Sequence, residues 1–127
     1  MKIEEQVCSL EQAKKLEGLG VKIDTYFVWA TFGTVSYVRP REIRNILPIY
    51  KEYLAPNVAE LGVLLNLNTG FYMLTLGDKS TAEFKAKCTD YDYMHQEING
   101  ESEAQARTEA LIWLIENKYT KVEDLKL

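Results

Sequence analysis

The segment from 102 to 117 constrains this chain more than any other, because it predicts a helix that is apolar around much of its circumference. Ser102 is a favourable N-cap, and Gln105 stands at the capping-box position three residues later. Apolar side chains then recur at helical spacing. They are Ala104, Ala106, Ala110, Leu111, Ile112, Trp113, Leu114 and Ile115. Such a helix needs a large apolar surface to cover it, so we expect it to pack across a β-sheet.

Several other segments have the composition of strands. Residues 26–32 are β-branched and aromatic on both faces, which is typical of a central strand. Gly33 separates them from a second run at 35–38, and the two runs predict a hairpin. The further strand candidates are residues 71–76, 83–89 and 93–98. These patterns predict an antiparallel sheet of four to five strands.

Capping signatures mark two more helices. Ser9 predicts a helix over about 10–18, and Asn57 predicts another directly after it, since each is followed three residues later by the Gln or Glu of a capping box. Pro48 is tolerated in the first turn of a helix, so residues 48–54 are interpreted as a further short helix. With the C-terminal helix, the chain is expected to contain three or four helices.

Length sets the domain organisation. A chain of 127 residues is too short for two ordinary cores. We therefore expect a single α+β domain over residues 1–127, with an antiparallel sheet of four to five strands, three or four helices, and the C-terminal helix packed across the sheet. The tail over 122–127 is expected to dock through Leu125.

The charge balance bears on the class of partner. Fifteen Lys and Arg against nineteen Asp and Glu give a formal net charge of −4, which argues against non-specific binding to nucleic acid or to an anionic membrane. No stretch approaches about 18 consecutive apolar residues, and the acidic start lacks the basic region of a signal peptide. We expect a cytoplasmic protein with no membrane partner.

The residue types that carry metal and nucleophilic chemistry are few and scattered. His95 is the single histidine, and on a strand its side chain points away from those of Asp90 and Asp92. Cys88 lies on the apolar face of an alternating strand, where burial raises the pKa of a thiol. Cys8 precedes a helix start, whose dipole favours a lower pKa, but no general base stands near it. Common phosphate-loop, nucleophile-elbow and zinc-helix motifs do not occur, so we expect no cofactor, no metal and no enzymatic activity.

Two groups of residues are candidates for contact with a partner. Arg39, Arg41 and Arg44 belong to one basic cluster, beside tyrosines that could stack on nucleic-acid bases. The alternative is a solvated loop in which these arginines pair with the surplus acids. Tyr91 and Tyr93 lie near an expected turn and are candidates for a protein-interaction surface, which also leaves room for a homo-oligomer.

Residues 84–117 resemble the closing half of a double-stranded RNA-binding domain, in which strands lead into an apolar helix. Those domains place lysines at the start of that helix to meet phosphates. Here Glu101, Glu103 and Gln105 occupy the corresponding positions, and Arg107 is the one basic residue left. The resemblance therefore implies no RNA-binding residue.

A second resemblance touches most of the chain. Residues 7–16, 19–21 and 26–29 are similar to the opening of a group of small proteins carried by phages, prophages and related mobile elements of gut bacteria, and residues 55–62 and 104–117 extend the match. The matching positions are helix caps and core residues. The resemblance implies a genetic setting and brings no activity, cofactor or catalytic residue with it.

These observations predict an accessory protein of a phage or mobile element that acts as a non-catalytic protein-interaction module. The alternative is a nucleic-acid-binding protein that uses Arg39, Arg41 and Arg44.

Overall fold

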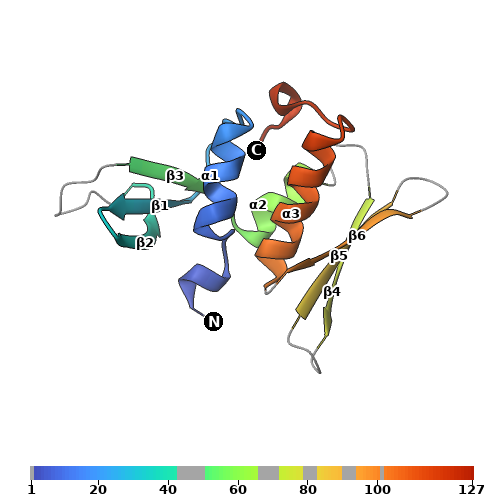
Figure 1. Ribbon diagram of the computed structural model, residues 1–127, viewed down its shortest axis with the longest axis horizontal. Helices are drawn as coiled ribbons and strands as arrows, with labels where there is room; N and C mark the ends of the chain where they lie inside the picture. The colour runs from blue at the N-terminus through green and yellow to red at the C-terminus, as the bar shows by residue number, and fades with distance from the viewer. Residues whose placement is uncertain (1, 43–50, 66–71, 79–82, 90–93, 101) are drawn as a thin grey trace.

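The computed structural model describes residues 2–42, 51–65, 72–78, 83–89, 94–100 and 102–127, and it describes the three segments between 72 and 100 by their backbone. The elements, in chain order, are η1 (Ile3–Glu5), α1 (Leu10–Gly18), β1 (Phe27–Phe32), β2 (Val35–Pro40), β3 (Lys51–Ala55), α2 (Val58–Val63), β4 (Tyr72–Asp78), β5 (Glu83–Thr89), β6 (Met94–Gly100), α3 (Glu103–Glu116) and η3 (Val122–Asp124). We call β2-β1-β3 the N-terminal sheet and β4-β5-β6 the C-terminal sheet. The α-helices lie between the two sheets (Figure 1).

The α+β class, the antiparallel pairing and the packing of the C-terminal helix on a sheet are confirmed. The predicted single sheet of four to five strands is wrong, because the described strands form two sheets of three. β3 returns to pair with β1, and α2 then leads the chain to β4 in the other sheet. α3 packs against the C-terminal sheet, while α1 packs against β3. Hydrophobic periodicity identifies strands but not their partners, which explains the difference.

The predicted helix caps are confirmed by their hydrogen bonds. At the start of α1 the Ser9 hydroxyl accepts the Gln12 N–H at 3.2 Å, and the Gln12 side chain accepts the Ser9 N–H at 3.0 Å. Asn57 and Glu60 form the same reciprocal pair at the start of α2, with both distances 2.9 Å. The Ser102 hydroxyl accepts the Gln105 N–H at 3.1 Å, so Ser102 is the N-cap of α3, but the reciprocal bond of the predicted capping box is not found between these two described residues. These bonds satisfy N–H groups that have no partner inside a helix.

Gln12 has a second role, because it also connects α1 to α3. Its Nε2 donates to the backbone oxygen of Gln105 at 3.0 Å and to the carboxylate of Glu109 at 2.9 Å. Lys15, one turn further along α1, forms an ion pair with Glu116 at 2.9 Å. The side chain that caps α1 is therefore also a buried contact between the two helices.

The predicted hairpin and its central strand are confirmed. β1 lies between β2 and β3, and its middle residues Val28, Trp29 and Ala30 are buried. Gly33 in the turn between β1 and β2 has φ of +59°, a conformation that costs little for glycine and much for other residues. The Trp29 indole donates to the backbone oxygen of Cys8 at 2.9 Å, which joins the sheet to the chain before α1.

The predicted short helix over 48–54 is wrong where the structure describes it. Residues 51–55 form β3, which pairs antiparallel with β1 so that Tyr53 lies opposite Trp29. Residues 48–50 lie outside the described part of the chain. A short apolar segment fits a strand and a helix about equally well by periodicity alone. The pairing with β1, which the local sequence does not reveal, decides the outcome.

Two groups of buried side chains make up the described core. The larger group surrounds α3 and α2, and the smaller lies between the N-terminal sheet and the chain before and within α1. The larger contains Leu16, Val21, Ile23, Leu61, Leu64, Leu65, Ala104, Ala106, Ala110, Leu111, Ile112, Leu114 and Leu125. The smaller contains Val7, Cys8, Ala13, Trp29, Val38 and Ala55. The predicted docking of the tail through Leu125 is thus confirmed.

Candidate functional site

A cleft of about 560 Å³ opens between the N-terminal sheet and the chain that follows α1. Residues 20–24 form one wall, β1 contributes Val28, and β3 contributes Glu52, Tyr53 and Leu54. Glu17 near the end of α1 and Arg41 just after β2 complete its border. A cleft of this size falls within the range that holds small ligands or side chains of a partner.

The floor of the cleft is apolar because the chain after α1 alternates. Val21 and Ile23 are buried in the larger core group, whereas Lys22 and Asp24 between and after them are exposed. Val28 of β1 adds a third buried aliphatic residue to the lining. The same alternation therefore places apolar side chains against the core and charged ones at the rim.

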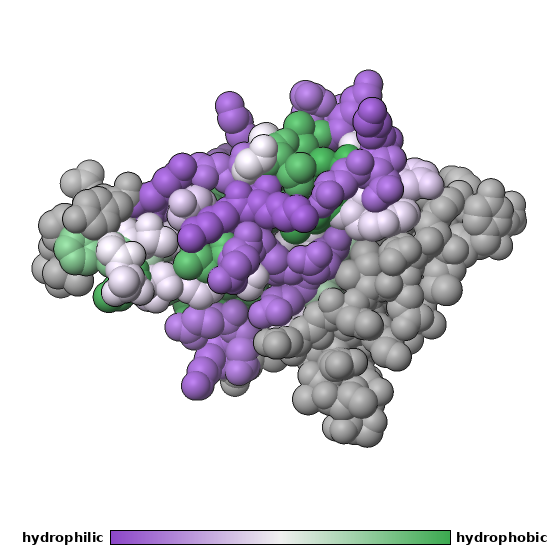
Figure 2. All heavy atoms as spheres, in the orientation of Figure 1, coloured by the Kyte–Doolittle hydropathy of each residue, from purple (hydrophilic) through white to green (hydrophobic). Residues whose placement is uncertain are grey.

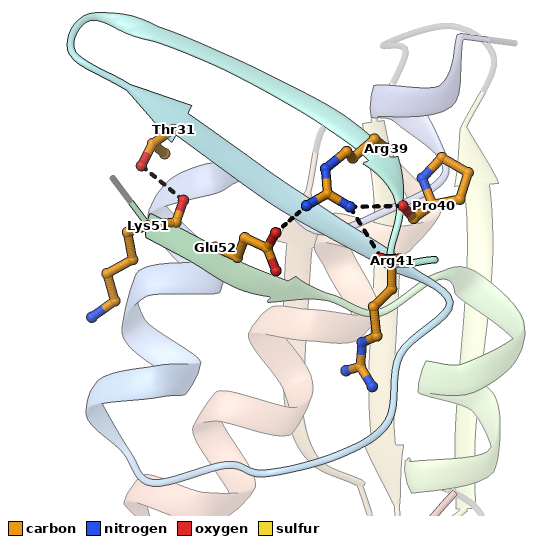
Figure 3. A network of polar contacts seen from close by, with 6 residues as sticks. All are labelled: Thr31, Arg39, Pro40, Arg41, Lys51 and Glu52. Atoms are coloured by element: carbon orange, nitrogen blue, oxygen red, sulfur yellow. Dashed lines mark hydrogen bonds and ion pairs between the residues drawn. The ribbon is translucent and has the colours of Figure 1, made fainter. Parts of the chain in front are cut away.

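An ion pair between Arg39 and Glu52 crosses the central strand of the N-terminal sheet (Figure 3). Arg39 on β2 lies opposite Val28, and Glu52 on β3 lies opposite Ala30, so the pair spans β1 diagonally. Ala30 is fully buried, and its small side chain leaves room for a guanidinium on that face. The pair thus joins the two outer strands of the sheet to each other.

Arg39 is held by more than this carboxylate. Its side chain is 9% exposed, and its Nη1 donates to the backbone oxygens of Pro40 at 2.9 Å and Arg41 at 3.2 Å (Figure 3). Its Nε is buried and has no hydrogen-bond partner among the described residues. A buried charge is costly unless it is paired, so this guanidinium depends on Glu52.

The two other acids on the rim are also paired. Asp24 accepts from Arg41 at 3.0 Å, and Arg41 donates as well to the backbone oxygen of Ile23 at 3.3 Å. Glu17 pairs with Lys51 at 3.0 Å, and the hydrogen bond that Lys51 donates to Glu17 is the main cause that raises the pKa of Lys51. The rim of the cleft is therefore a series of ion pairs around an apolar floor.

Lys22 differs from the other bases at the rim. It is exposed, and within the described part of the chain it forms no ion pair. Lys22 and Arg41 border the same part of the cleft, because Arg41 is hydrogen-bonded to the residue that follows Lys22. This side of the rim therefore carries one cation more than it has acids to pair with.

The structure describes two of the three arginines of the predicted nucleic-acid contact, and it places them differently from each other. Arg39 is buried in the N-terminal sheet and paired with Glu52, so its guanidinium is not on the surface. Arg41 is partly exposed and paired with Asp24. Arg44 lies outside the described residues. Both described arginines pair with acids, as the alternative predicted, but Arg39 does so within a strand and not in a solvated loop. Pairing of β2 and β3 with β1 brings Glu52 close to Arg39.

Other candidate residues fall outside the description. Tyr91 and Tyr93 are among the residues that the structure does not describe, and so are the side chains of Cys88 and His95. Of the described residues, no three or more His, Cys, Asp or Glu gather as metal ligands would. The interaction surface at Tyr91 and Tyr93 stays a prediction.

Cys8 is not activated by the dipole of α1. Cys8 is fully buried, and burial raises the pKa of its thiol from 9.0 to about 12. Its Sγ lies 3.9 Å from the backbone oxygen of Leu54, within the smaller core group. Desolvation of the thiolate outweighs the helix dipole, so this thiol behaves as a core side chain.

Arg107, the one basic residue at the start of the C-terminal helix, is engaged inside the protein. It donates to Glu103 at 3.0 Å and to the backbone oxygen of Val58 at 3.3 Å. Gly62 on α2 makes this possible, since a Cβ there would lie 2.7 Å from the guanidinium. Arg107 therefore fastens α3 to α2.

Comparisons with protein-family models, with curated proteins and with solved structures find no match. Of the described helices, none has the length and apolarity required to cross a membrane. Lys22, Asp24 and Glu52 at the cleft were not foreseen from the sequence. The alternation over 21–25 is the one local signal that could have revealed the first two.

Proposed function

We propose that this protein is a non-catalytic protein-interaction module that receives part of its partner in the cleft. One observation carries the proposal, namely an apolar floor of Val21, Ile23 and Val28 bordered by paired charges. Protein interfaces combine a desolvated apolar centre with a polar rim, and beside this floor the half-buried Leu54 offers a partner side chain an apolar contact.

The remaining described surface supports the choice of the cleft over a broad apolar face. On the face seen in Figure 2, hydrophilic side chains gather over the helices, and hydrophobic ones are visible in small areas between them. Among the described residues, the exposed large hydrophobic side chains belong to different parts of the chain. They are Tyr26, Val35, Val63, Tyr119 and Leu127. Single exposed apolar residues of this kind are ordinary on a protein surface.

The non-catalytic part of the proposal is supported by the ionisable groups at the cleft. Glu17, Asp24 and Glu52 each accept hydrogen bonds from a base. The nearby thiol of Cys8 is buried, and its raised pKa keeps it protonated at neutral pH. General acid–base or nucleophilic catalysis uses a group with a pKa near the working pH or an activated nucleophile. The Cys8 thiol is neither of these.

The genetic setting is a separate part of the proposal and rests on the resemblance alone. We infer that the protein is an accessory protein of a phage or mobile element. Sequencing the DNA on both sides of its gene tests this. Structural, packaging or integration genes of a phage or mobile element in the flanking DNA are expected, and a run of housekeeping genes on both sides contradicts it.

A selection experiment tests the interaction module directly. A displayed library of random peptides is selected on the purified full chain, and the selected peptides are added to the isotopically labelled protein while its amide resonances are recorded. We expect the largest shifts at residues 20–24 and 52–54. Peptides that shift other parts of the protein and leave these residues unchanged would contradict the proposal.

Two variants of the same type sharpen this test. Leu54 lines the cleft and is half-buried, whereas Leu10 is half-buried beside the smaller core group. Leu54→Ala should weaken the selected peptides by about fivefold or more, the effect of losing one apolar contact at an interface centre. Leu10→Ala should leave their affinity unchanged. Equal losses in both variants would indicate a general effect on folding, which circular dichroism measures independently.

A further inference from the structure

We propose that the segment of the partner that enters the cleft carries an apolar side chain next to a carboxylate. The inference rests on the proposed function, and it names the chemistry of the partner at the same site. The apolar part follows from Val21, Ile23 and Val28 in the floor. The carboxylate follows from the charges around them.

Lys22 and Arg41 are the cations that a partner can reach. Lys22 is exposed and forms no ion pair within the described chain. Arg41 is paired with Asp24, but the Asp24 side chain is 99% exposed, so this pair is open to exchange with another carboxylate. Exposed ion pairs of this kind contribute little to stability. The free energy needed for a partner carboxylate to displace Asp24 from Arg41 is therefore small.

The other two acids of the rim do not oppose an incoming carboxylate strongly. The buried guanidinium of Arg39 neutralises Glu52, and Lys51 neutralises Glu17. Lys22, Asp24 and Arg41 together give this part of the rim one cation in excess, and a partner carboxylate that displaces Asp24 from Arg41 meets both cations. A guanidinium also offers paired N–H donors, which match the two oxygens of a carboxylate.

A nucleic-acid occupant fits these residues less well. An oligonucleotide brings a row of phosphates, whereas Lys22 and Arg41 can meet one or two anionic groups, on a protein whose formal net charge is −4. Bases are held by stacking on aromatic rings, and the lining of the cleft contains a single aromatic residue, Tyr53. Tyr53 is half-buried, and the Lys51 Nζ already lies 5.2 Å from the centre of its ring. An acidic apolar peptide meets both the floor and the two cations.

The test uses three defined peptides that differ in one residue. Each is acetylated, amidated and of the form Gly-Gly-Leu-Xaa-Leu-Gly-Gly, with Glu, Gln or Lys at the variable position. Each is titrated into the labelled full chain at low salt, and the shifts of residues 20–24 report binding. We expect the Glu peptide to bind about two- to fivefold more tightly than the Gln peptide, the scale of one exposed charge pair, and the Lys peptide to bind most weakly.

Variants of this protein locate the charge preference. Lys22→Gln and Arg41→Gln should each reduce the difference between the Glu and Gln peptides, while Lys2→Gln, an exposed lysine near the N-terminus, should preserve it. Glu17 and Glu116 form a matched pair, since each is paired with a lysine and they are 46% and 44% exposed. Glu17→Gln should tighten the Glu peptide, and Glu116→Gln should not.

The outcomes separate the two proposals. Equal affinity of the Glu and Gln peptides at residues 20–24 overturns the acidic preference and leaves the interaction module standing. Binding of none of the three peptides overturns the acidic preference as well, and the library selection then decides the module. An eight-nucleotide single strand of DNA is titrated in the same way. If it shifts residues 20–24 at a lower concentration than the Glu peptide does, the inference is overturned in favour of nucleic acid.

Discussion

The core around α3 and the cleft side of the N-terminal sheet are held together by different interactions. Around α3, aliphatic side chains from α1, α2, α3 and the C-terminal tail bury one another. On the cleft side, ion pairs connect strands and loops around a cleft that is lined by a few aliphatic side chains. Burial is non-directional and resists change, whereas rim charges can exchange partners. The contrast assigns the stability of the fold to the packing around α3, and it agrees with the proposal that a partner binds at the cleft.

The largest expected effect tests the aliphatic side of this comparison. Leu111→Ala removes a fully buried side chain of α3 and should lower the free energy of unfolding by about 2–5 kcal/mol. Urea unfolding measures the loss. Val35→Ala, at an exposed position of β2, is the control and should change stability by no more than about 0.5 kcal/mol. A Leu111 variant as stable as the parent protein would mean that α3 is not docked.

The second prediction concerns the ion pair across β1. Glu52→Gln leaves the Arg39 guanidinium buried without its carboxylate, and we expect it to cost about 1–3 kcal/mol in urea unfolding. Because Glu52 is 42% exposed, water can partly replace its carboxylate, so we expect the lower part of that range. Replacing both residues, Arg39→Met with Glu52→Leu, should recover most of the loss, since no buried charge then remains. A double variant less stable than Glu52→Gln would contradict this account.

The third prediction uses pH to test the burial of Cys8. The unfolded thiol ionises near its ordinary pKa of 9.0, while burial holds the folded pKa near 12. Above pH 9 the unfolded state therefore binds fewer protons than the folded state, and stability should fall as pH rises, by up to about 1.4 kcal/mol per pH unit. Cys8→Ala in a Cys88→Ser background should lose this slope relative to Cys88→Ser alone.

The pH range of this experiment can be chosen so that lysines do not interfere. Partners raise the pKa of Lys15 and Lys51 above 10.5, so both stay charged below that pH. Between pH 8.5 and 10, the difference between the two proteins isolates Cys8, because every other ionisable group is common to both. If the free energies of unfolding of the two proteins depend on pH in the same way, the Cys8 thiol is accessible to water and is not buried.

The smallest expected effect tests the exchangeable rim. Asp24→Asn removes the carboxylate paired with Arg41, and because the Asp24 side chain is almost fully exposed we expect a change of at most about 0.5 kcal/mol. The same urea unfolding used for Glu52→Gln gives the comparison. A loss as large as that of Glu52→Gln would indicate that the whole rim is rigid and that Arg41 is unavailable to a partner.

The parts of the fold that could be predicted are those that local chemistry determines. Ser9 and Asn57 marked the beginnings of two helices because a hydroxyl or amide oxygen must reach an N–H three residues later. The central position of β1 followed from its apolarity on both faces. The alternation of residues 83–89 gave the bounds of β5.

The rest depended on contacts between segments far apart in the chain. By periodicity alone, residues 51–54 fit a helix and a strand about equally well. They form a strand because they pair with β1. Arg39 and Glu52 are brought together by the strand that runs between them, so neither sequence position indicates the ion pair. The cleft joins the loop after α1 to β3 and Arg41, and no local pattern predicts that meeting.

The double role of Gln12 links the start of α1 to the interior and, through α1, to the cleft. The amide that completes the capping box also donates to α3, so the first turn of α1 and its docking form together. The same helix leads directly into residues 20–24, the wall of the cleft. A ligand that steadies this wall should therefore slow the exchange of amide hydrogens throughout α1 and into the facing turns of α3. Because Gln12 connects α1 to α3, binding in the cleft should be measurable as slower amide hydrogen exchange even in α3, whose residues lie outside the cleft lining.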